Sequence, residues 1–284
     1  MREFKILAVV LFFTAIIYYG VEPFAHSQMH PHVAPADFGF KDLESLHVKG
    51  DARKGKELVS INCTACHSLN ADKLASSLSD AEAAIAYGVV PPDLSSTGAL
   101  YDANFLANFI KDPSKAVHLE HKFNDTKPYP MPNYSWMSDQ EIADMVVYLQ
   151  SIAPHTLSDK EVFVDACGRC HSMKYDKIQA QTSPEPLSAY MGTLPPDLSM
   201  MIRSKGEAYL HTFINNPQKQ LAGTSMPRVG LNEKAQTQVI AYLEAVGDRK
   251  KGERESLGYK LVGYMALFSL LAYLWKVKIW REVE

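Results

Sequence analysis

The chain has 284 residues, of which 46% are hydrophobic and 21% are charged, and its formal net charge is −3. This length favours two domains with additional segments, because a single compact domain usually contains about 100–200 residues. A net charge so close to zero gives no electrostatic basis for binding nucleic acid, so we expect no nucleic-acid partner.

The N-terminus carries Arg2 and Lys5, followed by an uncharged run over residues 6–21. As a helix this run would be about 24 Å long, a little short of the ~30 Å hydrocarbon core of a membrane. We expect residues 1–25 to form either a cleaved signal peptide, with the cleavage site at Ala25-His26-Ser27, or an uncleaved anchor. Both alternatives export the rest of the chain, because Arg2 and Lys5 hold the N-terminus in the cytoplasm.

The four cysteines form two close pairs, each followed directly by a histidine. The motifs are Cys63-Thr-Ala-Cys66-His67 and Cys167-Gly-Arg-Cys170-His171. This is the haem c attachment pattern, in which two thiols bond the vinyl groups and the histidine binds the iron. A pair of redox dithiols, or half a zinc site, is the alternative for a single motif. Two copies that use every cysteine predict two covalently attached haem c groups, and therefore a periplasmic location.

A shift of 104 residues aligns the sequence with itself. The haem motifs coincide, and Pro91-Pro92-Asp93-Leu94-Ser95 falls on the identical pentapeptide at 195–199. Identity in register with the motifs indicates a duplication. The first copy is nine residues longer after Pro113, since Met131-Pro132 matches Met226-Pro227 at an offset of 95. We therefore predict tandem domains at residues 50–154 and 155–248.

Helical patterns dominate both copies, which predicts an all-α fold. A helix is expected before each cysteine pair, over 55–66 and 158–170, and an amphipathic helix closes each copy. Ser158 with Glu161, and Ser138 with Glu141, have the spacing of capping boxes at helix starts.

The iron ligands follow from the repeat. His67 and His171 are the predicted proximal ligands, and a ligating imidazole needs its second ring nitrogen bonded, commonly to a backbone carbonyl. A Pro-Pro pair ends 25 residues after each histidine, so Pro92 and Pro196 are the candidate acceptors. Proline suits a stiff loop because its φ is fixed. An ordinary rigid turn is the alternative.

The sixth ligand should be a soft donor on a loop before the last helix. Met131 and Met226 occupy matching places in the two copies, so we predict that they bind the irons. His118 and His121 are the alternatives in the longer first copy.

A second apolar run extends from Leu261 to Trp275, flanked by Lys260, Lys276 and Lys278. The lysines can snorkel, and the nearby aromatic residues suit a membrane interface. A buried core helix is the alternative. We predict a C-terminal transmembrane anchor at residues 256–284, with its end in the cytoplasm.

Each copy resembles a class I cytochrome c domain. Gly55 and Val59, with Met145 and Tyr148 in the last helix, resemble that family's crossing of first and last helices. The second copy departs from the pattern because Asp159 replaces the glycine.

The stretch Leu194-Pro-Pro-Asp-Leu-Ser-Met-Met-Ile-Arg-Ser-Lys-Gly-Glu-Ala-Tyr209 and the C-terminal anchor are similar to cytochrome c1 of the quinol–cytochrome c reductase (cytochrome bc) complex. In that family an arginine of this signature binds a haem propionate, which implies Arg203 here, with Lys205 as the alternative. Cytochrome c1 ordinarily has one haem, so the resemblance is to its two-haem bacterial variant.

The resemblance implies an electron-transfer subunit in the bacterial inner membrane that performs no bond chemistry itself. Its implied partners are a b-type cytochrome subunit, a Rieske iron–sulfur protein, and a downstream cytochrome c or oxidase. The two-haem subunit of a cbb-type haem-copper oxidase is the main alternative, but such chains are anchored at the N-terminal side. A two-haem peroxidase would need an iron open to peroxide, which two Met-Pro loops do not favour.

Overall fold

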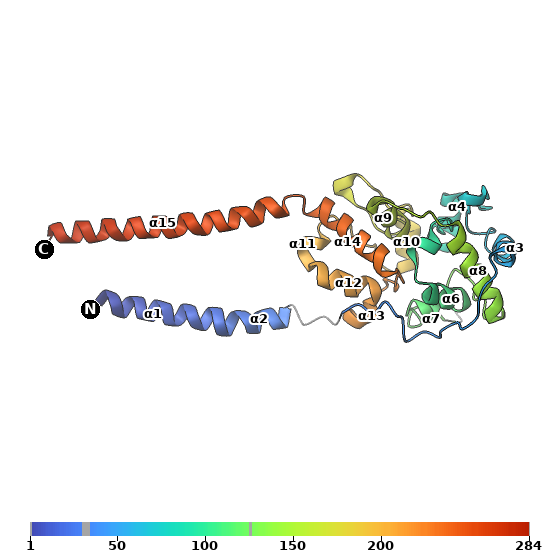
Figure 1. Cartoon of the computed structure of the whole chain (residues 1–284), viewed down its shortest axis with the longest axis horizontal. Coiled ribbons are helices and arrows are strands. Elements are labelled where there is room, and N and C mark those ends of the chain that lie inside the picture. Colours follow the sequence, from blue (N-terminus) through green and yellow to red (C-terminus); the bar gives the residue numbers. More distant parts are fainter. Residues whose placement is uncertain (1, 30–34, 125–126, 284) are drawn as a thin grey trace.

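Figure 1 shows the protein as a computed structural model, which describes residues 2–29, 35–124 and 127–283. Met1 and Glu284, the outermost residues of the two predicted terminal segments, lie outside the described residues. Within the described ranges every regular element is a helix, and strand pairing is limited to isolated bridges. The predicted all-α fold is therefore confirmed.

The globular part consists of two units with the same order of elements. The first unit contains α3 (Ala52–Asn62), η2 (Asn70–Asp72), α4 (Asp80–Tyr87), α5 (Thr97–Leu100), α6 (Ala103–Lys111), α7 (Pro113–Ala116) and α8 (Asp139–Ile152). The second unit contains α9 (Asp159–Cys167), η3 (Lys174–Asp176), α10 (Pro184–Met191), α11 (Met201–Lys205), α12 (Glu207–Asn215), α13 (Pro217–Gln220) and α14 (Glu233–Gly247). Both helices expected before the cysteines end earlier than predicted, α3 at Asn62 and α9 at Cys167, because the chain turns at the Cys-x-x-Cys-His segment. α3 also begins three residues before the expected start, at Ala52.

The predicted capping boxes are confirmed. The Ser138 hydroxyl accepts the Glu141 backbone N–H while the Glu141 carboxylate accepts the Ser138 backbone N–H, and Ser158 and Glu161 do the same at the start of α9. Each reciprocal pair satisfies two donors that a helix start leaves unpaired. The caps therefore fix where α8 and α9 begin.

The first and last helices of the first unit cross at Gly55. A Cβ atom placed there would lie 1.9 Å from the Asp144 carbonyl oxygen, so only glycine allows α3 and α8 to approach this closely. In the second unit the matching Asp159 is exposed and accepts a hydrogen bond from Gln238 Nε2 at 3.1 Å. The glycine-dependent backbone approach therefore belongs to the first unit.

A polar contact then ties the ends of each unit together. A lysine of the first helix and a tyrosine of the last helix meet one aspartate in the 3-10 turn after the histidine. These residues are Lys56, Tyr148 and Asp72 in the first unit, and Lys160, Tyr242 and Asp176 in the second. In the second unit the lysine Nζ and the tyrosine hydroxyl lie 2.8 and 2.6 Å from the same carboxylate oxygen.

The two units share apolar core. Leu100 belongs to the first unit in sequence but is buried in the core of the second, and Tyr101 packs against the cores of both. The backbone continues the contact, because Asp102 N–H donates to the Gly230 carbonyl at 3.0 Å and Asn232 N–H to the Leu100 carbonyl at 2.9 Å. The units therefore form one packed body.

The extra residues of the first copy strengthen this interface. Val117 and Phe123 are buried in a third apolar cluster with Phe40 and Phe105. Phe123 also packs on Tyr190 of the second unit, with ring centroids 5.3 Å apart. The insertion therefore forms part of the contact between the units.

An ion pair between a buried arginine and an exposed aspartate joins the segment before the first unit to the second unit. Arg228 donates to both carboxylate oxygens of Asp42, at 2.6 and 2.9 Å, and its side chain is only 2% exposed. The hydrogen bond from Arg228 lowers the pKa of Asp42. His118 Nε2 lies 3.1 Å from the same carboxylate.

Two long helices extend from the globular body toward the same end (Figure 1). The first consists of α1 (Arg2–Ile16), a π-helical turn (Ile17–Val21) and α2 (Glu22–Met29), and the second is α15 (Lys251–Val283). Over Glu3–Gln28 and Lys251–Arg281 both are long and apolar enough to cross a membrane. Lys276 Nζ lies 2.6 Å from Glu3 Oε2, which places the two chain ends side by side.

We predict that Gly55→Val destabilises the protein by about 1–3 kcal/mol or more, because the added side chain pushes α3 away from α8. Denaturant unfolding of the solubilised protein measures the loss. Asp159→Val is the matched control, because the corresponding position in the second unit is exposed. Equal losses at the two positions would show that close backbone approach is not what Gly55 provides.

Candidate functional site

Each motif histidine is held by the carbonyl of the second proline in its Pro-Pro pair. His67 Nδ1 lies 2.8 Å from the Pro92 oxygen, and His171 Nδ1 lies 2.8 Å from the Pro196 oxygen. The carbonyl can only accept, so Nδ1 carries the proton and Nε2 keeps its lone pair. Burial lowers the pKa of both histidines, which favours the neutral imidazole that a metal requires.

Cys63 and Cys66 lie in the turn after α3, whereas Cys167 ends α9 and Cys170 lies in the turn that follows. Cys63 and Cys167, the first cysteine of each motif, pack at the edges of the two unit cores. Burial raises the pKa of Cys63 to about 11 and that of Cys167 to about 12, and it also raises the pKa of Cys170. The thiols therefore stay protonated in an apolar setting, where they can add to haem vinyl groups while the neutral histidine faces the iron.

An aspartate locks each proline loop onto the segment after its histidine. In the first unit, Asp93 accepts from the Ser68 hydroxyl at 2.7 Å and from the backbone N–H groups of Asn70 and Ser95 at 3.0 and 2.9 Å. Burial raises the pKa of Asp93, but these hydrogen bonds outweigh it and hold the pKa below its usual value.

The second unit repeats this arrangement around Asp197. The Ser172 hydroxyl, Lys174 N–H and Ser199 N–H lie 2.7, 2.9 and 3.1 Å from its carboxylate oxygens. From the sequence, only the prolines of the repeated pentapeptide had a predicted role at the site. The identical Asp and Ser in both copies were the available signal for this clamp.

Met131 and Met226 are half-buried, and each packs against the core of its own unit. The alternatives in the first copy lie in other surroundings. His118 is bound to Asp42 beside Arg228, and His121 is exposed. The methionines therefore remain the better candidates for the sixth ligand.

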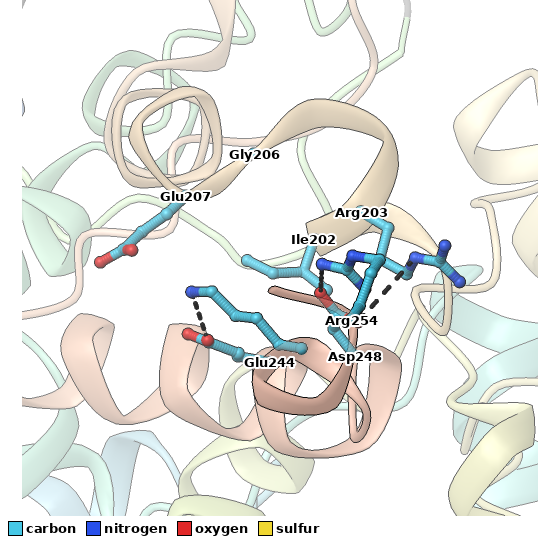
Figure 2. A pocket seen from close by; sticks show the side chains of 8 residues that line it. Ile202, Arg203, Gly206, Glu207, Glu244, Asp248 and Arg254 are labelled. Carbon is cyan, nitrogen blue, oxygen red and sulfur yellow. Dashed lines mark hydrogen bonds and ion pairs between the residues drawn. The ribbon is translucent and has the colours of Figure 1, made fainter. Parts of the chain in front are cut away.

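Arg203 lies at a charged hollow between α11, α14 and the start of α15 (Figure 2). Its Nε is 3.9 Å from an Asp248 carboxylate oxygen. The same carboxylate accepts hydrogen bonds from Arg254 Nη1 and Nη2, at 2.5 and 2.7 Å. Its side chain is about half exposed, at 49%. The alternative, Lys205, lies over the Tyr209 ring, 5.4 Å from the centroid.

An all-helical unit with a Cys-x-x-Cys-His turn behind its first helix and a carbonyl-bonded histidine is the architecture of a c-type cytochrome. Residues 52–153 and 160–247 each match the cytochrome c family model, and each stretch contains one complete motif. The chain belongs to the cytochrome c family. It therefore has two cytochrome c domains, binds haem c covalently and serves electron transport.

Among solved structures, a chain of a hyperthermophilic respiratory Complex III is similar at 20% sequence identity and a TM-score of 0.34, and the match covers 99% of both chains. No curated protein matches the sequence.

We predict that Asp93→Asn lowers stability by about 2 kcal/mol at neutral pH, because hydrogen bonds to a charged acceptor contribute about 1.5–3 kcal/mol. A carboxyl whose folded pKa is lowered stabilises above its unfolded pKa of about 4 and loses that contribution as pH falls. The difference from the unaltered protein should therefore shrink below about pH 4.

Denaturant unfolding at several pH values measures this difference. Asp197→Asn should behave alike, and the exposed Glu57→Gln serves as the control. A difference that stays constant down to acid pH would argue against a charged clamp.

Proposed function

We propose that the chain is a two-haem c-type cytochrome with one haem in each domain, with boundaries at residues 50–154 and 155–248. Cys63 and Cys66 would hold the first haem, and Cys167 and Cys170 the second. The observation that carries this proposal is the pair of identical His–Pro carbonyl contacts, one beside each cysteine pair. The same local chemistry, built twice, supports two equivalent attachment sites.

The bound haem supplies a one-electron couple, and the residues of the chain set its properties. His67 and His171 present Nε2 to the iron because Nδ1 is occupied by the Pro92 and Pro196 carbonyls. Thioether ligation by Met131 and Met226 would raise the potentials and leave no coordination position for a substrate. The chain would therefore carry electrons and do no bond chemistry itself.

We propose that both terminal helices span the bacterial inner membrane and hold the haem domains in the periplasm. Their large apolar side chains are exposed on all faces, which a water-facing helix does not tolerate over this length. Arg2, Lys5 and the lysines after Trp275 then lie on the cytoplasmic side. The basic residues over 249–254 lie on the periplasmic side and weaken this charge bias, so the haem motifs decide the orientation. The Lys276–Glu3 contact is compatible with two helices crossing side by side.

Within this class, the function best supported is the c1-type subunit of a bacterial quinol–cytochrome c reductase. The support is the sequence similarity over 194–209 and the position of α15 directly after the second domain. Lys251 and Arg254 of α15 bind Glu244 and Asp248 at 2.6 and 2.5 Å, so the helix is braced against that domain (Figure 2). Arg203 or Lys205 would bind a haem propionate.

The proposed electron donor is a Rieske iron–sulfur protein held on a b-type cytochrome subunit, and the acceptor is a downstream cytochrome c or oxidase. The N-terminal helix is the feature that fits the alternative, a two-haem subunit of a cbb-type oxidase. The C-terminal helix and the c1-like stretch favour the reductase.

We predict that Met131→Ala and Met226→Ala each reduce the sulfur-to-iron charge-transfer absorption of the ferric protein by about half, because one of two thioether ligands is lost. Mass spectrometry should still find two attached haems, since the cysteines are intact. Met145→Leu, a change of similar volume in the core, is the control. An unchanged band in Met131→Ala would point to another ligand, such as His121.

We predict that truncation after Gly247 keeps haem attachment but slows quinol-dependent haem reduction in membranes about tenfold or more, because docking loses its tether. A chain ending at Arg281 is the control, since it retains α15. Native reduction by quinol in the shorter chain would show that α15 is not the docking element. An intact chain that quinol never reduces would exclude the reductase assignment.

A further inference from the structure

Arg169 is a charged residue inside the haem motif of the second unit, at a position that Ala65 holds in the first. Its charge is felt in both units. The Arg169 guanidinium acts on the pKa of Tyr101, Tyr129 and His67, all of which belong to the first unit. The pKa of Tyr190 in the second unit responds to Arg169 as well, so Arg169 lies at the boundary between the two units.

Backbone contacts hold it there. The Arg169 carbonyl accepts the Thr182 N–H at 3.2 Å, and the Thr182 hydroxyl accepts the buried Val90 N–H at 3.1 Å. Val90 directly precedes the Pro-Pro pair whose carbonyl binds His67. The attachment turn of the second unit is thus fixed to the histidine-binding loop of the first.

The described residues provide no carboxylate that pairs with the Arg169 guanidinium. Its Nε is buried without a hydrogen-bond partner, and the described part of the chain provides no ion pair between Arg169 and a carboxylate. Arg169 lowers the pKa of Asp165, but burial outweighs this effect and raises the pKa of that carboxyl above its usual value. A guanidinium whose Nε is buried without a partner favours a bound carboxylate, because a buried charge that lacks compensation is unfavourable.

The other groups near Arg169 cannot supply negative charge in the mature protein. Tyr101 and Tyr129 have raised pKa values because they are buried, so both are neutral phenols. Cys167 and Cys170 become uncharged thioethers once haem is attached. The anions that a haem protein brings to such a place are the two haem propionates, and Arg binds carboxylates in bidentate geometry.

We propose that Arg169 binds a propionate of the first haem across the domain boundary, with the Tyr101 and Tyr129 hydroxyls as additional donors. The inference rests on the proposed function in requiring one haem in each domain. Because Arg169 lies between the two cysteines of the second haem, this contact joins the edge of one haem to the attachment peptide of the other. The first haem site is then complete only when both units are folded together.

Potentiometric titration of the full-length solubilised protein tests the proposal. Removing a positive charge beside a haem favours the ferric state, so Arg169→Gln should lower the midpoint of the first haem. We expect its reduced-to-oxidised ratio at a fixed ambient potential to fall roughly tenfold, with Arg169→Lys close to the unaltered protein. The Cys63→Ala/Cys66→Ala variant assigns the midpoints, because the titration wave that it lacks belongs to the first haem.

Ala65→Gln, the matched change in the other motif, should leave both midpoints in place. Tyr101 lies outside both motifs, so Tyr101→Phe should not disturb haem attachment. It should lower the midpoint of the first haem to a smaller extent, and it tests the proposal even if Arg169→Gln blocks attachment. Unchanged midpoints, or a shift confined to the second haem, would overturn the proposal. A single haem in the unaltered protein, measured by mass, would overturn the proposed function itself.

Discussion

The hydrogen bond between each motif histidine and a proline carbonyl is the contact on which the rest of each unit depends. It fixes the ring orientation and tautomer of His67 and His171 at the same 2.8 Å separation. The carbonyl can hold this place only if its loop is rigid, and proline restricts the loop while the carboxylates of Asp93 and Asp197 lock it. The lysine–aspartate–tyrosine contacts then close the first and last helices around the segment that follows the histidine.

The two units of the duplication are not independent domains, because they pack against each other. Leu100 lies in the core of the second unit, Tyr101 packs against both cores, and the insertion of the first copy covers Tyr190. Arg228, buried and bound to Asp42, ties the segment before the first unit to the second. Packing of this kind fixes the relative position of the two attachment turns, which a flexible linker would leave variable.

The second unit makes ion pairs with the start of the C-terminal helix. Asp248 joins Arg203 and Arg254, and Glu244 binds Lys251, so α15 continues from α14 with few intervening residues. Exposed ion pairs of this type contribute little stability individually. Together, these ion pairs orient α15 relative to the second unit.

The sequence alone determined the local chemistry. The spacing of Cys63, Cys66 and His67, repeated at an offset of 104, defined the attachment motifs. Helical patterns indicated the all-α class, and the Ser–Glu spacings indicated the helix caps, because all of these depend on neighbours close in the chain. It also placed Pro92 and Pro196 as candidate acceptors, since a repeat in register marks paired loops. Only the tertiary structure showed the aspartate clamps, the shared core at Tyr101 and the crossing of Arg169 into the first unit. These contacts join residues distant in sequence, and no periodicity or spacing along one chain records which surfaces of two folded units meet.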